Sequence, residues 1–227
     1  MSSRPGEVSV LIACWSPKGG CGTTVVSAAL ALVLAASEGP ALLADLDGDV
    51  PAVLGLPDPT GPGLAHWLHA GPDVPDDALA RLEVDVRRDL RLLPAGADGP
   101  AAGDDPGRSQ ALAVALAADR RPVVVDCGRA SSGAALAVAA GASLSLMVLR
   151  PCYLGLRRAL AAPLRASGVV LVSEEGRSLT RRDVEEVLGL PVRAEVPFDA
   201  TVARAVDAGL LAARVPRGLE RSLRGAA

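Results

Sequence analysis

Short apolar runs alternate along the chain with longer stretches that are rich in alanine and leucine. The runs consist mainly of Val and Leu, as do strands that are buried on both faces of a sheet. Residues 25–36 contain neither Gly nor Pro and predict a helix. Strands that alternate with helices predict an α/β fold. The strands are expected at residues 8–14, 40–45, 90–93, 122–126, 143–149, 168–173 and 192–196.

The composition fits a single folded domain with few aromatic side chains. Half of the 227 residues are apolar, but only two Trp, one Tyr and one Phe are present, so Ala, Val and Leu must form the core. The length suits one α/β domain. We expect a disordered start at 1–7, a domain at 8–215 and a C-terminal tail at 216–227. The Gly-, Pro- and Asp-rich stretch 94–108 is expected to be a surface loop.

A glycine-rich loop follows the first predicted strand. It contains Lys18, the only lysine among the 23 basic residues, in the sequence Lys18-Gly19-Gly20-Cys21-Gly22-Thr23-Thr24. Glycines let successive N–H groups converge on an anion, and the N-terminus of the following helix favours a phosphate. The alternative is a glycine-rich turn without a ligand. In a phosphate loop, the hydroxyl of Thr24 would bind Mg²⁺.

The loop departs from the pattern G-x-x-x-x-G-K-[ST] at two positions, because Pro17 replaces the first glycine and Thr23 replaces the lysine. With its early lysine, it resembles the deviant Walker A loop of the ParA/MinD superfamily. The small residue at Thr23 resembles the CpaE/TadZ branch and its septum-site-determining-like relatives in actinobacteria. This resemblance implies a P-loop three-layer α/β/α fold with about seven strands, and an ATP-dependent homodimer in which Lys18 reaches the partner's phosphates.

The resemblance extends over nearly the whole chain. The strand ending in Asp45 and Asp47 is similar to the family's second motif, and the strand ending in Asp126 has the Walker B form. The segment 196–199 resembles the loop that passes beside adenine. Ser173 stands where relatives usually carry an asparagine that reads the base, so base specificity stays open. The implied residues are Lys18 and Asp47 for catalysis, Lys18, Gly19, Gly20, Cys21, Gly22, Thr23, Thr24, Pro197, Phe198 and Asp199 for ATP, and Thr24, Asp45 and Asp126 for Mg²⁺.

Thr23 decides between two functions. A lysine there would make a charge-assisted contact of about 1.5–3 kcal/mol and would neutralise charge during phosphoryl transfer. Without it, ATP binding should survive while hydrolysis suffers. We therefore expect an ATP-dependent dimer that positions or scaffolds a pilus, secretion or septum assembly, with weak or absent hydrolysis. The alternative is a partitioning-type ATPase that cycles on nucleoid or membrane. The resemblance also includes bacterial tyrosine kinases, which autophosphorylate a cluster of tyrosines. Tyrosine kinase activity is disfavoured here because Tyr153 is the only tyrosine.

Charge and cysteine content add little to this interpretation. Residues 1–149 carry 10 basic and 17 acidic side chains, and residues 150–227 carry 13 and 9. The arginine-rich second half suggests nucleic acid or acidic lipid as ligands, but a solvated face is favoured. Leu219 and Leu223 offer too little area for stable membrane binding alone. The four cysteines are interpreted as buried thiols rather than metal ligands. With no signal peptide or membrane span expected, the protein should be cytoplasmic and reach a membrane or pole through a partner.

Overall fold

The computed structural model describes residues 10–71, 74–103 and 105–226. Residues 1–7, predicted to be disordered, and the expected first residues of the first strand lie outside this part. Within it the chain forms strands and helices in alternation. The strands are β1 Leu11–Trp15, β2 Ala41–Asp45, β3 Val84–Arg87, β4 Leu90–Leu93, β5 Val123–Asp126, β6 Leu144–Leu149, β7 Gly168–Ser173 and β8 Val192–Pro197. The helices are α1 Thr23–Glu38, α2 Val50–Leu54, α3 Leu64–His69, α4 Ala78–Leu82, α5 Pro106–Ala117, α6 Gly133–Gly141, α7 Tyr153–Leu160, α8 Arg181–Leu188, α9 Ala200–Asp207 and α10 Arg217–Leu223.

The strands of the described residues form one sheet with the order β3-β4-β2-β5-β1-β6-β7-β8. All neighbours are parallel except β3, which runs antiparallel to β4. The predicted α/β fold and its seven strands are confirmed. The eighth strand, β3, was missed because its sequence Val-Asp-Val-Arg is half charged and lies at an exposed edge, so it lacks the apolar run of a buried strand.

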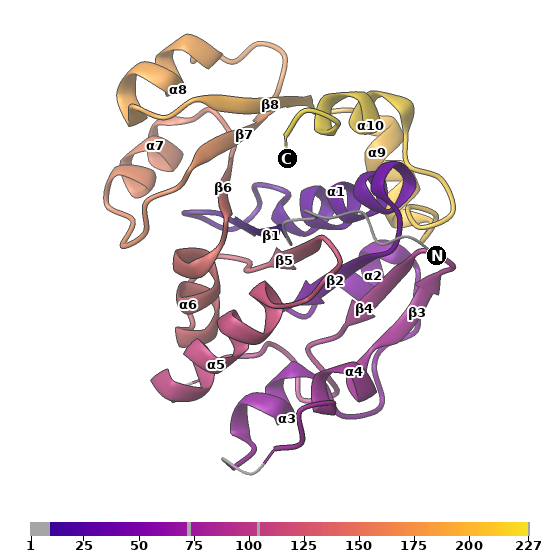
Figure 1. Cartoon of the computed structure of the whole chain (residues 1–227). Helices are drawn as coiled ribbons and strands as arrows, with labels where there is room; N and C mark the ends of the chain where they lie inside the picture. The colour runs from indigo at the N-terminus through magenta and orange to yellow at the C-terminus, as the bar shows by residue number, and fades with distance from the viewer. Residues whose placement is uncertain (1–9, 72–73, 104, 227) are drawn as a thin grey trace, which may run out of the picture.

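Helices cover both faces of the sheet, which gives three layers (Figure 1). One face packs against α1, α2 and α10, and the other packs against α3, α5 and α6. Helices α7 and α8 extend this second layer over β6, β7 and β8. The side chains alternate accordingly along β1, where Ile12 and Cys14 belong to the first cluster and Leu11 and Ala13 to the second. Both faces of the central strands are therefore buried, as their continuous apolar sequences predict.

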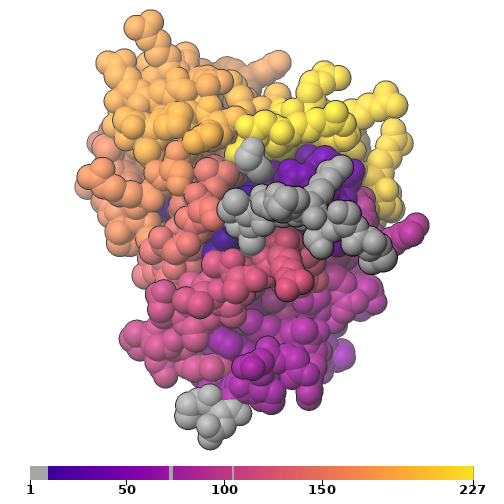
Figure 2. Space-filling view, in the orientation of Figure 1, coloured from indigo at the N-terminus to yellow at the C-terminus, as the bar shows by residue number. Residues whose placement is uncertain are grey.

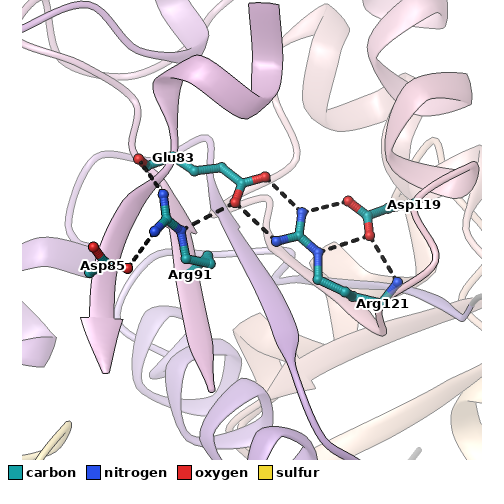
Figure 3. A network of polar contacts seen from close by, with 5 residues as sticks. All are labelled: Glu83, Asp85, Arg91, Asp119 and Arg121. Carbon is teal, nitrogen blue, oxygen red and sulfur yellow. Dashed lines mark hydrogen bonds and ion pairs between the residues drawn. The ribbon is translucent and has the colours of Figure 1, made fainter. Parts of the chain in front are cut away.

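An ion-pair network joins the β3 edge to the neighbouring strands (Figure 3). Arg121, just before β5, binds the Glu83 carboxylate at 2.7 and 2.9 Å and Asp119 at 2.7 Å. Arg91 of β4 pairs with Asp85 and with Glu83, whose side chain is only 9% exposed. Two guanidinium groups thus compensate one nearly buried glutamate, and the network holds the short hairpin in register.

The C-terminal segment is packed onto the domain. Leu219 and Leu223 are 3% and 1% exposed, and α10 lies against α1 and β8. Figure 2 shows this segment, in yellow, lying directly beside the purple residues of the first helix. In the described residues, no helix is both long and apolar enough to cross a membrane.

The stretch between β4 and α5 differs from the expected surface loop. Ala95 and Ala101 are buried, and the Ala101 N–H donates to the carbonyl oxygen of Leu46 at 3.0 Å. The prediction was wrong for these residues because the loop passes beside the turn that follows β2. Its alanines are small enough to fit there. The same stretch ends earlier than expected, since α5 begins at Pro106.

Candidate functional site

The loop between β1 and α1 presents glycines to an open space. Gly20 and Gly22 have φ values of +78° and +88°, and a Cβ added to either would meet no atom within 4 Å. A residue with a Cβ would be strained in this backbone conformation. Gly22 caps α1 without a side-chain hydrogen bond, and no acidic residue lies in the first turn. The first N–H groups of this 16-residue helix are thus available to an external anion, as a phosphate cradle requires.

Hydrogen bonds fix the base of the loop. The Ser16 hydroxyl donates to the Lys18 carbonyl oxygen at 2.8 Å, and the Ser16 N–H donates to the Gly128 carbonyl oxygen at 2.8 Å. The Lys18 ammonium group donates to the Gly19 carbonyl oxygen at 3.1 Å. The loop is therefore tied to the turn that follows β5, while its lysine stays on the loop's own backbone.

Two buried aspartates end neighbouring strands beside the loop. Asp45 of β2 and Asp126 of β5 are in register, and both are fully buried. The Asp45 carboxylate accepts hydrogen bonds from the backbone N–H groups of Asp47, Gly48 and Val50 at 3.1, 2.7 and 3.1 Å. Asp45 therefore organises the turn after β2. Burial raises its pKa to about 6 despite these three donors.

Asp126 is less well compensated. Its Oδ1 accepts from the Gly128 N–H at 3.1 Å, but its Oδ2 is buried without a hydrogen-bond partner among the residues that the structure describes. Burial, and then the charge of Asp45, raise the pKa of Asp126 to about 7, while the neighbouring Thr24 hydroxyl lowers it. A buried oxygen without a partner fits a cation or a cation-bound water. The residues present thus fit Mg²⁺ next to Thr24 and Asp126.

Protein side chains alone do not complete such a metal site. Among the described residues, no group of three or more His, Cys, Asp or Glu side chains is placed to hold a metal ion. Mg²⁺ keeps several waters and prefers one or two carboxylates together with substrate phosphates. The metal would therefore need the phosphates that the glycine loop is shaped to receive.

Asp47 lies at the tip of the turn after β2 and is about half buried. Its carboxylate packs against Gly128, where an added Cβ would lie 2.2 Å from Asp47 Oδ1. Burial, followed by the charge of Asp49, raises the pKa of Asp47, and Arg129 lowers it. Sequence reasoning missed Gly128 and Arg129. The available signal was a glycine and a cation two and three residues after the strand-ending Asp126.

A mostly apolar pocket of about 280 Å³ lies on the other side of the loop. Gly20, Cys21 and Gly22 form one wall, and the predicted residues Pro197, Phe198 and Asp199 form another. Asp199 caps α9 by accepting from the Thr201 N–H at 2.7 Å, which fixes the loop next to Phe198.

The pocket also contains a residue that the sequence analysis did not identify. The Arg150 guanidinium lies 4.9 Å from the centre of the Phe198 ring, and Arg150 Nε is buried without a hydrogen-bond partner in the described part of the chain. Arg150 follows β6, a position that carries no local sequence signal. Ser173 ends β7, in register with Pro197 at the end of β8.

All these groups lie at the carboxyl ends of the parallel strands, around β1 between β5 and β6. In open α/β sheets, ligands bind where the strand order reverses in this way. Cys14, Cys21 and Cys127 lie here as free, buried thiols. Burial raises the pKa of Cys14 to about 12 and that of Cys127 well above its usual value, so neither is a reactive thiolate.

Comparisons with known proteins agree with this geometry. Residues 12–212 match the family model described as the CobQ/CobB/MinD/ParA nucleotide binding domain. No curated protein matches the sequence. The fold is similar to a ParA family ATPase from Chlorobium tepidum, with a TM-score of 0.77 and 19% identity over 96% of this chain and 97% of that one.

Two further structures share the fold. MinD from Pyrococcus horikoshii, complexed with Mg-ADP, aligns with a TM-score of 0.75 and 20% identity over 95% of this chain and 93% of that one. The MinC:MinD cell division complex of Aquifex aeolicus aligns with a TM-score of 0.72 and 18% identity, over 95% of this chain and 94% of that one.

Proposed function

The chain belongs to the CobQ/CobB/MinD/ParA family of nucleotide-binding domains, and from this premise we propose that it binds ATP together with Mg²⁺. The observation that carries the proposal is the convergence of a glycine cradle, a buried carboxylate with an unpartnered oxygen, and an apolar pocket at one sheet edge. The phosphates of a nucleoside triphosphate match the glycine cradle, its metal matches the buried carboxylate, and its base matches the apolar pocket. The Mg-ADP complex of Pyrococcus horikoshii MinD supports this choice.

Each predicted residue then has a role. The backbone N–H groups of residues 19–24 bind the phosphates. Thr24 and Asp126 would hold Mg²⁺, while Asp45 fixes the turn beside them. Bound Mg²⁺ would neutralise the charge of the β- and γ-phosphate oxygens. Pro197, Phe198 and Asp199 lie beside the base, which is adenine in this proposal.

The loop functions as a deviant Walker A motif of the CpaE/TadZ type. Lys18 makes no contact with an acidic side chain among the described residues, which leaves it available to a second subunit. It reaches the partner's phosphates in an ATP-dependent homodimer. Thr23 is the first residue of α1 and supplies no charge there.

In this proposal the dimer positions or scaffolds a pilus, secretion or septum assembly, with weak or absent hydrolysis. The Aquifex aeolicus MinC:MinD complex supports a protein partner. The competing function is an active partitioning-type ATPase. One observation favours it, because the Asp47 carboxylate lies against Gly128 beside Asp126, where it can orient a water molecule.

The proposed organisation keeps residues 8–215 as the nucleotide-binding domain and 216–227 as a C-terminal tail, in a cytoplasmic protein recruited through its partner. Nucleic acid and lipid are not favoured as ligands. Several arginines of the second half are compensated, since Arg177, Arg181 and Arg224 pair with Glu174, Glu185 and Glu220.

Nucleotide titrations test the proposal. The purified protein is titrated with ATP and ADP in Mg²⁺ or EDTA, and its mass and phosphate release are then measured. We expect ATP binding, a dimer only with ATP, and phosphate release well below that of partitioning ATPases. Absence of ATP binding in Mg²⁺ would overturn the proposal, whereas rapid release would favour the active ATPase.

Variants at Thr24 test the metal site. Thr24→Ala should lower the affinity for ATP far more in Mg²⁺ than in EDTA, while Thr60→Ala at an exposed position should change neither. Equal losses in both buffers would show that the Thr24 hydroxyl serves packing only.

A further inference from the structure

Arg129 lies over the glycine loop without a fixed partner. Its Cδ is the nearest heavy atom to the position that a Cβ on Gly19 would take, at 3.8 Å. Within the described part of the chain, its guanidinium forms no ion pair within 4 Å, and the residue is exposed. A long cationic side chain thus extends across the open face of the loop.

The turn that carries Arg129 is rigidly attached to the loop. The Ser16 N–H donates to the Gly128 carbonyl oxygen at 2.8 Å, and the Ala130 N–H donates to the Cys127 carbonyl oxygen at 2.8 Å. Ala130 has a φ of +48°, and among the described residues other than glycine no further residue has a positive φ. These bonds fix the backbone on both sides of Arg129, so its side chain starts from a defined position beside the loop.

The three cations around the loop have different surroundings. Arg150 stacks on Phe198 in the apolar pocket, and Lys18 donates to the backbone of Gly19. Arg129 lies outside the lining of the pocket and directly follows Gly128, against which the Asp47 carboxylate packs. On the proposed function, a nucleotide whose base fills the pocket would extend its phosphates across the loop towards Asp47. Its terminal phosphate would then lie near Arg129.

We propose that the Arg129 guanidinium binds the terminal phosphate oxygens of the nucleotide and so supplies, for binding, positive charge that the loop lacks at Thr23, while the bridging oxygen stays without a cation from the loop. The inference rests on the proposed function and adds a residue that distinguishes triphosphate from diphosphate. Its planar, permanently charged group can bind two phosphate oxygens at once. The charge comes from the turn after β5 instead of from the first turn of α1.

Affinities for ATP and ADP in Mg²⁺ test the inference by calorimetry. Arg129→Ala should weaken ATP binding by about 10- to 100-fold, the range for a charge-assisted contact, and leave ADP binding within about twofold. Arg120→Ala is the matched control. It removes an equal charge from an exposed residue just before β5, at the opposite edge of the sheet, and should change neither affinity.

A second variant distinguishes the loss of the Arg129 charge from a distortion of the loop caused by the substitution. Thr23→Lys in the Arg129→Ala background restores a cation at the loop and should recover the preference for ATP over ADP. Equal losses for both nucleotides in Arg129→Ala, or no loss for either, would overturn the inference while the proposed function stands. A wild-type protein that binds neither nucleotide would overturn the proposed function, and the inference with it.

Discussion

At the scale of single residues, the buried carboxylate of Asp126 is the least compensated group of the site. Its Oδ2 has no hydrogen-bond partner within residues 10–71, 74–103 and 105–226, and Asp45 adds a second buried carboxylate on the neighbouring strand. Such an arrangement destabilises the protein without its ligand, and the two carboxylates are held together by the sheet register. The sequence alone indicated both residues, because each ends an apolar strand. It could not indicate that Asp45 is satisfied by backbone donors and Asp126 is not, since this depends on the turns that follow.

Asp126→Asn should therefore stabilise the metal-free protein at alkaline pH. Because the folded pKa is raised from 3.8 to about 7, the folded state holds this proton more tightly than the unfolded chain. The contribution of this group to the free energy of unfolding is complete below about pH 4 and is lost as pH rises from about 4 to 7. Urea unfolding in EDTA measures the free energy of unfolding at pH 5 and at pH 8. Its decrease between these two pH values should be smaller in the variant than in the wild type, by about 1–3 kcal/mol. Asp58→Asn, at an exposed site, is the control, and an equal loss in Asp126→Asn and wild type would contradict the argument.

Thr23→Lys should raise phosphate release from ATP clearly above that of the wild type. The added ammonium would approach the bridging oxygen in a loop that is already shaped for phosphate. Asp47→Ala in this background should abolish the gain if Asp47 orients the attacking water. A steady-state phosphate assay measures both. A Thr23→Lys variant that binds ATP but releases no more phosphate would show that the site lacks more than this cation.

At the scale of elements, the sequence pattern predicted the features that depend on residues adjacent in the chain. The β1 strand, the glycine loop and α1 are contiguous, so apolar pattern and glycine spacing were sufficient to identify them. The edge strand β3 was missed because half of its residues are charged, and the contact that ties this edge to the region before β5 comes from Arg121, 38 residues away from Glu83. Arg150 and Arg129 were missed for a similar reason. Each follows a strand, and only the assembled sheet places it beside Phe198 or Gly19.

The C-terminal helix α10 provides an element-scale prediction. Leu223 is 1% exposed and belongs to the cluster around α1, so Leu223→Ala should lower the free energy of unfolding by about 2–5 kcal/mol. Leu210→Ala, at a side chain that is 53% exposed, should change it by less than about 0.5 kcal/mol. Denaturant unfolding compares the two. Equal stability of Leu223→Ala and wild type would mean that α10 detaches easily, as a membrane-docking tail requires.

At the scale of the whole molecule, the sheet edge that carries the loop also carries exposed large hydrophobic side chains. Tyr153 and Leu154 begin α7, directly after β6, and are 77% and 46% exposed. Gly19 and Gly20 are exposed on the same edge. Phosphates bound there would lie within reach of a second molecule. The fold thus offers a face on which two copies can meet over their nucleotides, as the proposed dimer requires.

Lys18→Ala tests that dimer, because the lysine is the cation proposed to cross between subunits. Light scattering after size-exclusion chromatography should show wild type as a dimer with ATP and a monomer with ADP or no nucleotide. Lys18→Ala should stay a folded monomer in all three, since its ammonium donates to the backbone carbonyl of Gly19 and the loss of this exposed contact leaves the subunit intact. Arg120→Ala, which removes a charge from the far edge, should dimerise like wild type. An ATP-dependent dimer in Lys18→Ala would assign the dimer contact to other residues, with Tyr153 and Leu154 the next to substitute.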